Sequence, residues 1–306
     1  MNRLFWYYKI VIIELKYFYH AIFFSFRKEE LQREPIVRYS HSGSVKANYD
    51  QPICFFCSYD KHSDIKENVY YYLNELRLAG FDIIFISSSN TLSKGDLEKL
   101  SSQCIKIINR ENKGYDFYGW KIALREYPDY RMHRALLLAN DSVLGPFFSI
   151  KNIINRLENE EADIIGMTDS LQFHPHLQSY FLYCKKTVTN SQEFIGFFNS
   201  IDVLGFKMAI VRKYEVGFSQ SLCNRFKLSA LYSLDNSLSR IQCLEKPKNL
   251  IDVTHDLWKP LITELKFPFL KKRIVAKRGI TIGEIAEVLT ESNSNYPPDI
   301  LTDQIR

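Results

Sequence analysis

Polar side chains stand directly after several short apolar runs of this 306-residue chain. The run LLLA at 136–139 precedes Asp141, and the run at 104–109 precedes Arg110 and Asp116. Carboxylate oxygens bind hard cations and accept hydrogen bonds from hydroxyl groups, and arginine binds phosphate through paired hydrogen bonds. These residue types therefore suit a site for a polar, charged ligand. A plain turn capped by side chains is the alternative interpretation around Asp141.

The elements that must position these residues alternate along the chain from residue 52 onward. The predicted strands cover 52–60, 81–89, 104–110, 134–141 and 162–170, and the predicted helices cover 65–80, 92–103, 120–127 and 147–160. This alternation predicts an α/β fold with a mostly parallel sheet flanked by helices. Ligands bind such sheets at the carboxyl ends of the strands, where the polar residues stand. The sequence contains neither G-x-G-x-x-G after its first strand nor a P-loop motif, so it carries no signature of a dinucleotide or P-loop site.

Composition and charge narrow the class of protein further. Hydrophobic residues make up 46% of the chain and charged residues 25%, which is enough apolar material for a folded core. The net charge of +5 is dispersed, so nucleic acid is not an expected partner. The six cysteines include one close pair, Cys54 and Cys57, without a second pair or histidines at zinc-ligand spacing. We interpret the cysteines as core thiols of a protein in a reducing compartment.

The amino-terminal segment is strongly apolar up to residue 26, but charged side chains interrupt it. These charges, and the lack of a cleavage site after them, argue against a secretory signal and against a transmembrane helix. On a helix, one basic stripe about 40° wide contains Lys9, Lys16, His20 and Arg27, whereas Glu14 falls outside it. Such a stripe on an apolar helix is typical of a segment that lies in a membrane interface. Packing against the protein's own body or a second subunit is the alternative.

Four parts of the chain are predicted. They are a membrane-interface helix at 1–33, a linker at 34–51, a catalytic domain at 52–275, and a helix with a polar tail at 276–306.

Five blocks of the sequence, taken in order, resemble the rhamnan synthesis F family of bacterial polysaccharide glycosyltransferases. They are NRENKGYDFYGWKIAL (109–124), LLLANDSVLGPF (136–147), HPHLQSYFLYC (174–184), YEVGFSQSL (214–222) and THDLWKPLITELKFPFLKK (254–272). The resemblance covers about residues 52 to 275. It implies a GT-A type, Rossmann-like fold, a nucleotide-sugar donor, and a lipid-linked or polysaccharide acceptor at the cell surface. The sugar that the resemblance implies is rhamnose or another hexose.

The resemblance also implies a donor site. In the usual GT-A enzyme an Asp-x-Asp motif holds Mg²⁺ or Mn²⁺ at the donor diphosphate, whereas this chain has the single carboxylate Asp141 there. Asp141 and His255 are the expected metal ligands, and the missing second carboxylate leaves open whether a metal is required. The expected donor-binding residues are Tyr59, Asp60, Arg110, Asn112, Gly114, Asp116, Asn140 and Asp141. A simple β–α turn is the alternative interpretation of the loop before Asp116.

Inverting transfer needs a general base that deprotonates the acceptor hydroxyl. By resemblance Glu215, at a predicted helix start, is the first candidate, and Asp169 is the second. A solvated glutamate is the alternative interpretation of Glu215. The expected acceptor-binding residues are His174, His176 and Gln178.

The expected location is the cytoplasm, with peripheral association at the inner face of the plasma membrane and a possible homo-oligomer. Two other functions compete with the enzyme hypothesis. One is a non-catalytic GT-A-like scaffold subunit of a polysaccharide assembly complex, which the missing Asp-x-Asp supports. The other is a nucleotide-binding regulatory domain.

Overall fold

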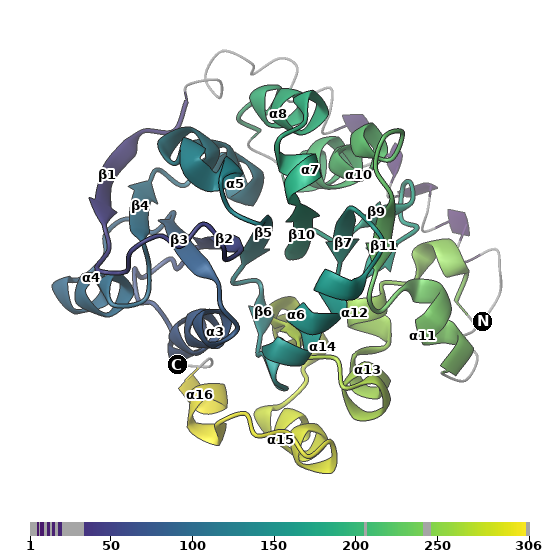
Figure 1. Ribbon diagram of the computed structural model, residues 1–306. Coiled ribbons are helices and arrows are strands. Elements are labelled where there is room, and N and C mark those ends of the chain that lie inside the picture. The colour runs from purple at the N-terminus through teal and green to yellow at the C-terminus, as the bar shows by residue number, and fades with distance from the viewer. Residues whose placement is uncertain are drawn as a thin grey trace.

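A computed structural model describes residues 34–204, 207–240 and 246–303, together with residues 5, 7, 8, 11, 12, 14, 15, 18 and 19 of the amino-terminal segment. Its centre is an eight-stranded sheet with the order β1-β4-β3-β2-β5-β10-β7-β11 (Figure 1). The strands are β1 (Val37–Ser42), β2 (Ile53–Ser58), β3 (Asp82–Ser87), β4 (Lys106–Arg110), β5 (Ala135–Asn140), β7 (Ile164–Gly166), β10 (Phe181–Lys185) and β11 (Leu228–Ala230). β1 and β10 run antiparallel to their neighbours, and the other neighbouring pairs are parallel. The predicted α/β class with a mostly parallel sheet is thereby confirmed.

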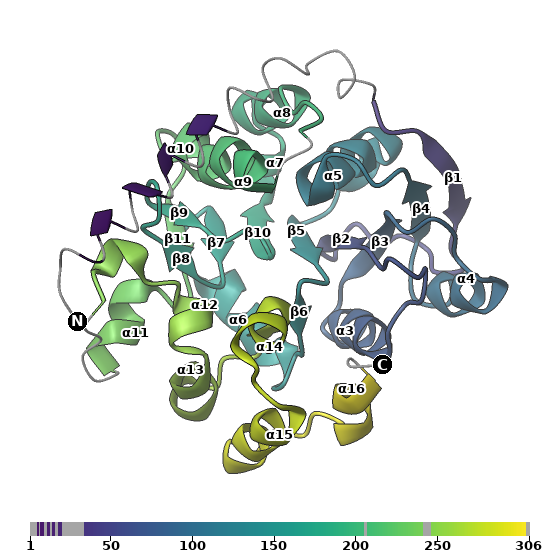
Figure 2. The ribbon, with the colours of Figure 1, turned by 180° about the vertical axis from the view of Figure 1, so that it is seen from behind.

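Helices cover both faces of the sheet (Figures 1 and 2). The α-helices are α3 (Glu67–Leu78), α4 (Lys94–Ser101), α5 (Tyr115–Glu126), α6 (Ile150–Asn159), α7 (Lys186–Thr189), α8 (Gln192–Asn199), α9 (Lys207–Ile210), α10 (Gly217–Leu222), α11 (Leu234–Arg240), α12 (Val253–Asp256), α13 (Trp258–Leu265), α14 (Lys272–Arg278), α15 (Ile282–Glu291) and α16 (Pro298–Asp303). Two 3₁₀ turns (Pro128–Arg131 and Lys248–Leu250) and one π-helix, η2 (Val211–Val216), complete the helical segments described.

The central strand β2 shows why its sequence reads as a continuous apolar run. Cys54 and Phe56 face one core cluster together with residues of α3, whereas Phe55 and Cys57 face a second cluster together with residues of α5. Side chains alternate between the two faces of a strand, so a sheet covered on both sides needs apolar residues at every position. All six residues of β2 are buried, which agrees with this requirement.

The amino-terminal border of the folded body differs from the prediction. Residues 34–51 are not only a linker, because β1 lies within them and pairs with β4 as an edge strand of the sheet. The guanidinium of Arg38 fixes this edge by donating hydrogen bonds to the carbonyl oxygens of Ser89 (3.0 Å) and Arg110 (2.6 Å). An edge strand covered on one face needs few apolar residues, so its sequence looks like a polar connection.

The carboxyl-terminal border also differs, because the segment after residue 275 is part of the folded body. α15 and α16 contribute to a third apolar cluster that includes Leu144, Phe147 and Trp258. The buried Asn68 of α3 links the carboxyl-terminal segment to the loop after β6. Its Oδ1 accepts hydrogen bonds from the hydroxyl of Tyr296 (2.6 Å) and from the backbone N–H of Gly145 (2.9 Å).

Smaller differences concern single elements. α5 begins at Tyr115, five residues before the predicted start, and the predicted strand 162–170 is divided into β7 and the short β8 (Asp169–Ser170), which pairs with β9 (His176–Leu177). Cys54, Cys57, Cys104 and Cys184 are buried free thiols, as expected, but Cys223 is exposed. Cys243 lies outside the described residues.

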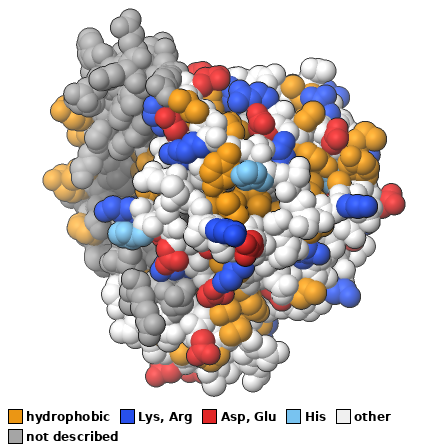
Figure 3. Space-filling view, turned by 90° about the vertical axis from the view of Figure 1, so that its left-hand side faces the viewer, with side chains coloured by type: hydrophobic (Ala, Val, Ile, Leu, Met, Phe, Trp, Pro, Cys, Tyr) orange, Lys and Arg blue, Asp and Glu red, His pale blue; other side chains and the backbone are white. Residues whose placement is uncertain are grey.

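The described residues of the amino-terminal segment are helical and lie beside α10 and β9 (Figures 1 and 2). The carboxylate of Glu14 forms an ion pair with Arg212 of η2. The predicted basic stripe of Lys9, Lys16, His20 and Arg27 lies outside the described residues. Among the residues the structure describes, no helix combines the length and the apolar character that a membrane span requires. At the β1 edge of the sheet, acidic and basic side chains are interspersed over the surface (Figure 3).

Candidate active site

The carboxyl ends of β2 and β5 bring the first polar residues together. The side chain of Asn140 donates a hydrogen bond from Nδ2 to Oδ2 of Asp116, at 2.9 Å. Asp141 is held from the other side, because its Oδ2 accepts hydrogen bonds from the hydroxyl of Ser58 (2.8 Å) and from the backbone N–H of Tyr59 (3.2 Å). Two carboxylates thus lie on either side of Asn140 at the edge of the sheet where ligands bind.

The electrostatics of Asp116 show that these carboxylates influence each other. Burial, followed by the negative charge of Asp141, raises the pKa of Asp116 to about 6, although the positive charge of Arg110 acts in the opposite direction. A carboxyl group with a raised pKa beside a second carboxylate is a common feature of functional sites. A ligand that brings positive charge to this pair would be stabilised there.

Arg110 has a different role from the one its charge suggested. The guanidinium is fully buried and donates hydrogen bonds to the carbonyl oxygens of Glu111 (2.8 Å), Lys113 (2.6 Å) and Tyr115 (2.5 Å). These bonds hold the β4–α5 loop, in which Gly114 adopts the left-handed conformation with φ +73°. Arg110 therefore shapes the loop that presents Asp116, and a direct phosphate contact by this side chain does not follow from its position.

Glu215 reaches the site from η2, in the middle of a helical segment that runs from Lys207 to Leu222, and not from a helix start as predicted. Its Oε1 accepts a hydrogen bond of 2.8 Å from the backbone N–H of Ser179, just before β10. Ser179 lies at the same edge of the sheet as Asn140, because Asn140 N–H donates to the neighbouring carbonyl oxygen of Tyr180. Glu215 is partly exposed, so its carboxylate is accessible.

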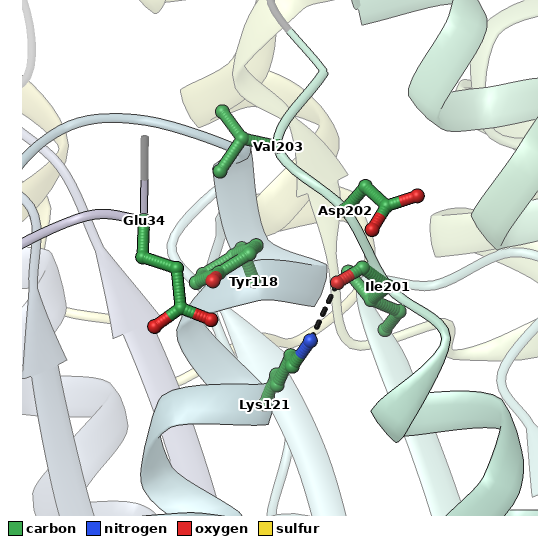
Figure 4. Close-up of a pocket in the computed structure, with 6 residues that line it drawn as sticks. All are labelled: Glu34, Tyr118, Lys121, Ile201, Asp202 and Val203. Atoms are coloured by element: carbon green, nitrogen blue, oxygen red, sulfur yellow. Dashed lines mark hydrogen bonds between the residues drawn. The ribbon is translucent and has the colours of Figure 1, made fainter. Parts of the chain in front are cut away.

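A pocket of about 260 Å³ lies between α5 and residues 201–203, which link α5 to η2 (Figure 4). Lys121 of α5 donates a hydrogen bond of 2.7 Å to the carbonyl oxygen of Ile201. The next residue, Asp202, donates its backbone N–H to the hydroxyl of Tyr214 at 2.7 Å. α5 carries Asp116 and η2 carries Glu215, so this link sets the relative position of two carboxylates of the site.

Lys271 was not among the expected site residues, and the structure places it in their midst. The short strand β12 (Leu270–Lys271) pairs with β6 (Val143–Leu144), which follows directly after Ser142. The Nζ atom of Lys271 lies 3.5 Å from Oγ of Ser142 and 3.8 Å from the ring centroid of Tyr180. In the sequence, Lys271 lies within the block 254–272 that resembles the family. It belongs to a basic cluster that the sequence alone predicts to face solvent or a membrane.

Gln178 and His255 meet a further acidic residue, Asp252, at the amino end of α12. Gln178 accepts a hydrogen bond from Thr168 Oγ1 (2.6 Å) and donates its Nε2 to Asp252 Oδ1 (3.4 Å). Nδ1 of His255 lies 3.8 Å from Asp252 Oδ2. Asp252 also acts on the charge of Lys271. This places the predicted acceptor residue Gln178 close to the carboxylates.

The side chains of the site show which metal ligands are available to the expected divalent cation. Asp116 and Asp141 offer the oxygen ligands that Mg²⁺ and Mn²⁺ prefer, and their like charges favour a cation near both. Within the described part of the chain, no three His, Cys, Asp or Glu side chains converge as a metal site would require. A cation at the two aspartates would have to take its remaining ligands from water and phosphate, and His255 is not shown beside them.

The remaining predicted site residues are engaged elsewhere or are more exposed. Asp169 Oδ1 accepts the backbone N–H of Leu234 (2.6 Å) at the start of α11, and Asp60 Oδ1 accepts the backbone N–H of His62 (2.7 Å) in its own loop. Nδ1 of the buried His176 lies 2.8 Å from the carbonyl oxygen of the exposed His174. Asn112 is exposed, and Tyr59 contributes its backbone N–H to Asp141 while its side chain is 48% exposed.

Most of the chain matches a known protein family. The family model for rhamnan synthesis protein F (RgpF) matches residues 83–306, which include the aspartates, Glu215 and Lys271. The chain belongs to the rhamnan synthesis protein F family. This confirms the resemblance drawn from the sequence blocks; the match begins at residue 83 instead of about 52 and continues through the carboxyl-terminal helices.

Relatives of this RgpF family chain show the extent of the similarity. The uncharacterized protein y4gN of Sinorhizobium fredii is 27% identical over 185 residues, which are 58% of this chain and 48% of that protein. The virulence protein VirA of Vibrio anguillarum is 33% identical over 136 residues, 42% of this chain and 41% of VirA. The chain thus spans about half, or less, of the length of these relatives.

Two solved structures show a low similarity to the RgpF family chain. A cytidylyltransferase of Leptospira borgpetersenii has a TM-score of 0.35 and 7% identity, and covers 71% of this chain and 97% of its own. A Bacillus anthracis protein, provisionally assigned as a glucose-1-phosphate thymidylyltransferase and solved with sucrose, has a TM-score of 0.38 and 9% identity, with coverages of 63% and 98%.

Proposed function

We propose that this protein is a glycosyltransferase of GT-A type that transfers a sugar, rhamnose or another hexose, from a nucleoside-diphosphate donor to a growing surface polysaccharide. The observation that carries the proposal is the location of four charged residues at the carboxyl edge of a mostly parallel sheet: Asp116, Asp141, Glu215 and Lys271. Membership of the rhamnan synthesis protein F family supports polysaccharide synthesis as the process.

The charges of the site suit the bond changes of an inverting transfer. The acceptor oxygen forms a bond to the anomeric carbon while the bond from that carbon to the diphosphate oxygen breaks, and the electron pair stays on the diphosphate. The leaving diphosphate gains negative charge, so positive groups close to it stabilise the transition state. A divalent cation held by Asp141 and Asp116 would supply Lewis-acid stabilisation there.

The proton of the acceptor hydroxyl needs a base within reach. Glu215 is the proposed base, because its carboxylate is partly exposed at the site and only one of its oxygens, Oε1, accepts the Ser179 N–H. Asp169 is the less favourable candidate, since its Oδ1 caps the start of α11 through Leu234. Gln178, His174 and His176 are proposed for the acceptor side, with Gln178 nearest to the charged residues through Asp252.

Peripheral membrane association at the cytoplasmic face is proposed from the exposed surface of the amino-terminal helix. Seven apolar side chains there are 41 to 67% exposed: Phe5, Tyr7, Tyr8, Val11, Leu15, Phe18 and Tyr19. Aromatic residues are enriched at membrane interfaces because their rings suit the headgroup level. A lipid-linked acceptor in the same membrane would then be near the enzyme. A homo-oligomer joined through this surface is the competing proposal.

The decisive experiment is a thermal-shift and hydrolysis panel with dTDP-, UDP- and GDP-sugars, with and without Mn²⁺. A true donor binds the native state and raises its unfolding temperature by mass action. Stabilisation by one nucleotide-sugar together with slow hydrolysis supports a transferase. Stabilisation without turnover on any acceptor would favour the scaffold function, and no stabilisation by any member of the panel would contradict nucleotide-sugar binding altogether.

A further inference from the structure

The backbone around Lys271 is fixed by long-range pairing. Leu270 pairs with Leu144 and Lys271 with Val143, and the backbone N–H of Lys272 donates to the carbonyl oxygen of Ser142 at 3.0 Å. β12 therefore lies directly against the residues that follow Asp141. Its side chains are positioned by strand pairing and not by a free loop.

A close approach at Gly145 supports the same arrangement. Gly145 has φ +117°, and a Cβ atom at this position would lie 2.3 Å from the carbonyl oxygen of Pro268. The backbone N–H of Phe147 also donates to that oxygen at 2.8 Å. The segment that leads into Lys271 is thus seated tightly against the segment that leaves β5.

The surroundings of the Lys271 ammonium group lack a direct counter-ion. Its Nζ contacts the hydroxyl of Ser142 and the ring face of Tyr180, and no carboxylate oxygen of the described residues lies within the 4.0 Å of an ion pair. Burial lowers the pKa of Lys271 to about 8, against the influence of Glu215 and Asp252. The ammonium group therefore remains mostly charged at pH 7.

Four other charged groups face Lys271 at longer range. The carboxylates of Glu215, Asp252 and Asp116 act to keep it protonated, whereas the charge of Lys207 acts against protonation. These groups come from η2, the start of α12, α5 and α9. The ammonium group is thus surrounded on several sides but paired directly on none.

A cation that has lost part of its hydration without gaining an ion pair is unfavourable in the free protein. An anionic ligand that reaches the same place would supply the missing partner. Ser142 stands beside Asp141 at the end of β5, where a nucleotide donor would place its phosphates at the carboxyl edge of the sheet. Lys271 is a partly exposed residue at this edge.

We propose that Lys271 binds the diphosphate of a nucleoside-diphosphate ligand, with its ammonium group donating to a phosphate oxygen next to Ser142. The proposal rests on the proposed function, and it names a positive group supplied by the chain itself at the leaving group. Lys271 contributes to diphosphate binding both with and without a divalent cation.

The test compares Lys271→Gln with Lys271→Arg and with the neighbouring control Lys272→Gln. Isothermal titration calorimetry measures the affinity of each protein for dTDP, UDP and GDP, for the matching monophosphates, and for the free nucleosides, in Mn²⁺ and in EDTA. Removal of a charge-assisted hydrogen bond is expected to weaken diphosphate binding by about 10- to 100-fold. Monophosphate binding should fall less, and nucleoside binding and the Lys272→Gln protein should be unchanged.

The Arg variant protects the test against misfolding and against a purely structural role. Lys271→Arg keeps the charge, so diphosphate binding should stay within about fivefold of the wild type. Wild-type affinity should fall as the pH rises above about 8, whereas that of the Arg variant should not, because arginine stays protonated.

Two outcomes overturn the proposal: wild-type diphosphate affinity in Lys271→Gln, or an equal loss for free nucleosides. Diphosphate binding that depends on Lys271 without any sugar transfer would contradict the proposed function and leave this inference standing. A wild-type protein that binds none of the diphosphates would contradict both.

Discussion

Asn140 Nδ2 donates a 2.9 Å hydrogen bond to Asp116 Oδ2, and this bond joins the end of β5 to the first turn of α5. Oδ1 of Asn140 accepts from the backbone N–H (3.1 Å) and the hydroxyl (2.6 Å) of Ser142. Both the nitrogen and the oxygen of the Asn140 amide therefore form hydrogen bonds. A carboxylate at position 140 can keep the contacts to Ser142 but cannot donate to Asp116.

Asn140→Asp should accordingly lower the free energy of unfolding by about 1–3 kcal/mol at pH 8, because a hydrogen bond is lost and a negative charge is placed beside Asp116. The pKa of Asp116 is about 6, so at pH 5 its protonated carboxyl group can donate to the introduced carboxylate and most of the loss should disappear. Mn²⁺ should raise the melting temperature of the variant more than that of the wild type. Urea unfolding at both pH values measures the effect.

The matched control is Asn155→Asp, the same chemical change at an exposed position of α6. It should leave stability within about 0.5 kcal/mol of the wild type. An equal loss at pH 5 and pH 8 in Asn140→Asp would show that Asp116 is not the cause.

Asp141→Asn removes the charge of the proposed donor-binding carboxylate and keeps its size. An amide oxygen at this place can still accept from the hydroxyl of Ser58 and the N–H of Tyr59, so the melting temperature should change little. Affinity for the nucleotide-sugar that stabilises the wild type should fall at least about tenfold when Mn²⁺ is present. Unchanged affinity in calorimetry would remove Asp141 from the donor site.

Glu215→Gln tests the proposed base. Loss of a general base typically slows turnover by about 10²- to 10⁴-fold, with little change in donor affinity. Asp169→Asn should instead act on stability, because Asp169 Oδ1 accepts the N–H of Leu234 at the start of α11. Steady-state kinetics and melting curves of both variants separate the roles. If Asp169→Asn abolishes turnover while Glu215→Gln keeps more than about a third of it, the base is Asp169.

His133 predicts a pH dependence of stability that is separate from the site. It is fully buried between the hydroxyl of Tyr127 (3.1 Å) and the carbonyl oxygen of Gln51 (3.2 Å), and burial lowers its pKa below the ordinary 6.5. The unfolded chain therefore binds the proton more readily, and stability falls as the pH drops below about 6.5. His133→Gln should remove this part of the pH dependence. Urea unfolding at pH 5.5 and 7.5 tests this prediction. An equal change in the free energy of unfolding between the two pH values in both proteins would refute it.

The exposed aromatic face of the amino-terminal helix predicts vesicle binding. Replacement of Tyr7, Tyr8 and Phe18 together by serine should release the protein from anionic vesicles in a sedimentation assay, while hydrolysis of the donor is kept. Leu78→Ser is the control, because Leu78 is a 71% exposed apolar residue on α3. Equal vesicle binding by the triple variant would assign the helix to packing or to an oligomer, which analytical ultracentrifugation would detect.

The central strands could be predicted because the local sequence alone determines their apolar pattern. β2, β3 and β5 are buried on both faces, so each is an apolar run that ends in polar residues. The edge strand β1 was not recognised, because none of its residues is buried and its pairing partner β4 lies about 70 residues away. Edge position is a property of the sheet and is not visible in the strand alone.

The site shows the same limit. Asp116 and Asn140 could be placed together because both follow parallel strands. Lys271 could not, since it reaches Ser142 across 129 residues of sequence through the pairing of β12 with β6. Arg110 shows that charge alone does not assign a role, because both terminal nitrogens of its guanidinium already donate to backbone carbonyl groups of the β4–α5 loop.

The π-helix η2 has one more consequence, for the register of two contacts. A π-helical turn holds one residue more than an α-helical turn, so η2 sets the rotation between the parts of the helix before and after it. Arg212 faces Glu14 of the amino-terminal segment, and Glu215 faces Ser179 at the site. Deletion of one residue between them, such as Lys213, would change the angle between Arg212 and Glu215 around the helix axis, so one of the two contacts should be lost. The extra residue of the π-helical turn thus fixes the directions of Arg212 and Glu215, so that a single helix contacts the amino-terminal segment and positions a site carboxylate at the same time.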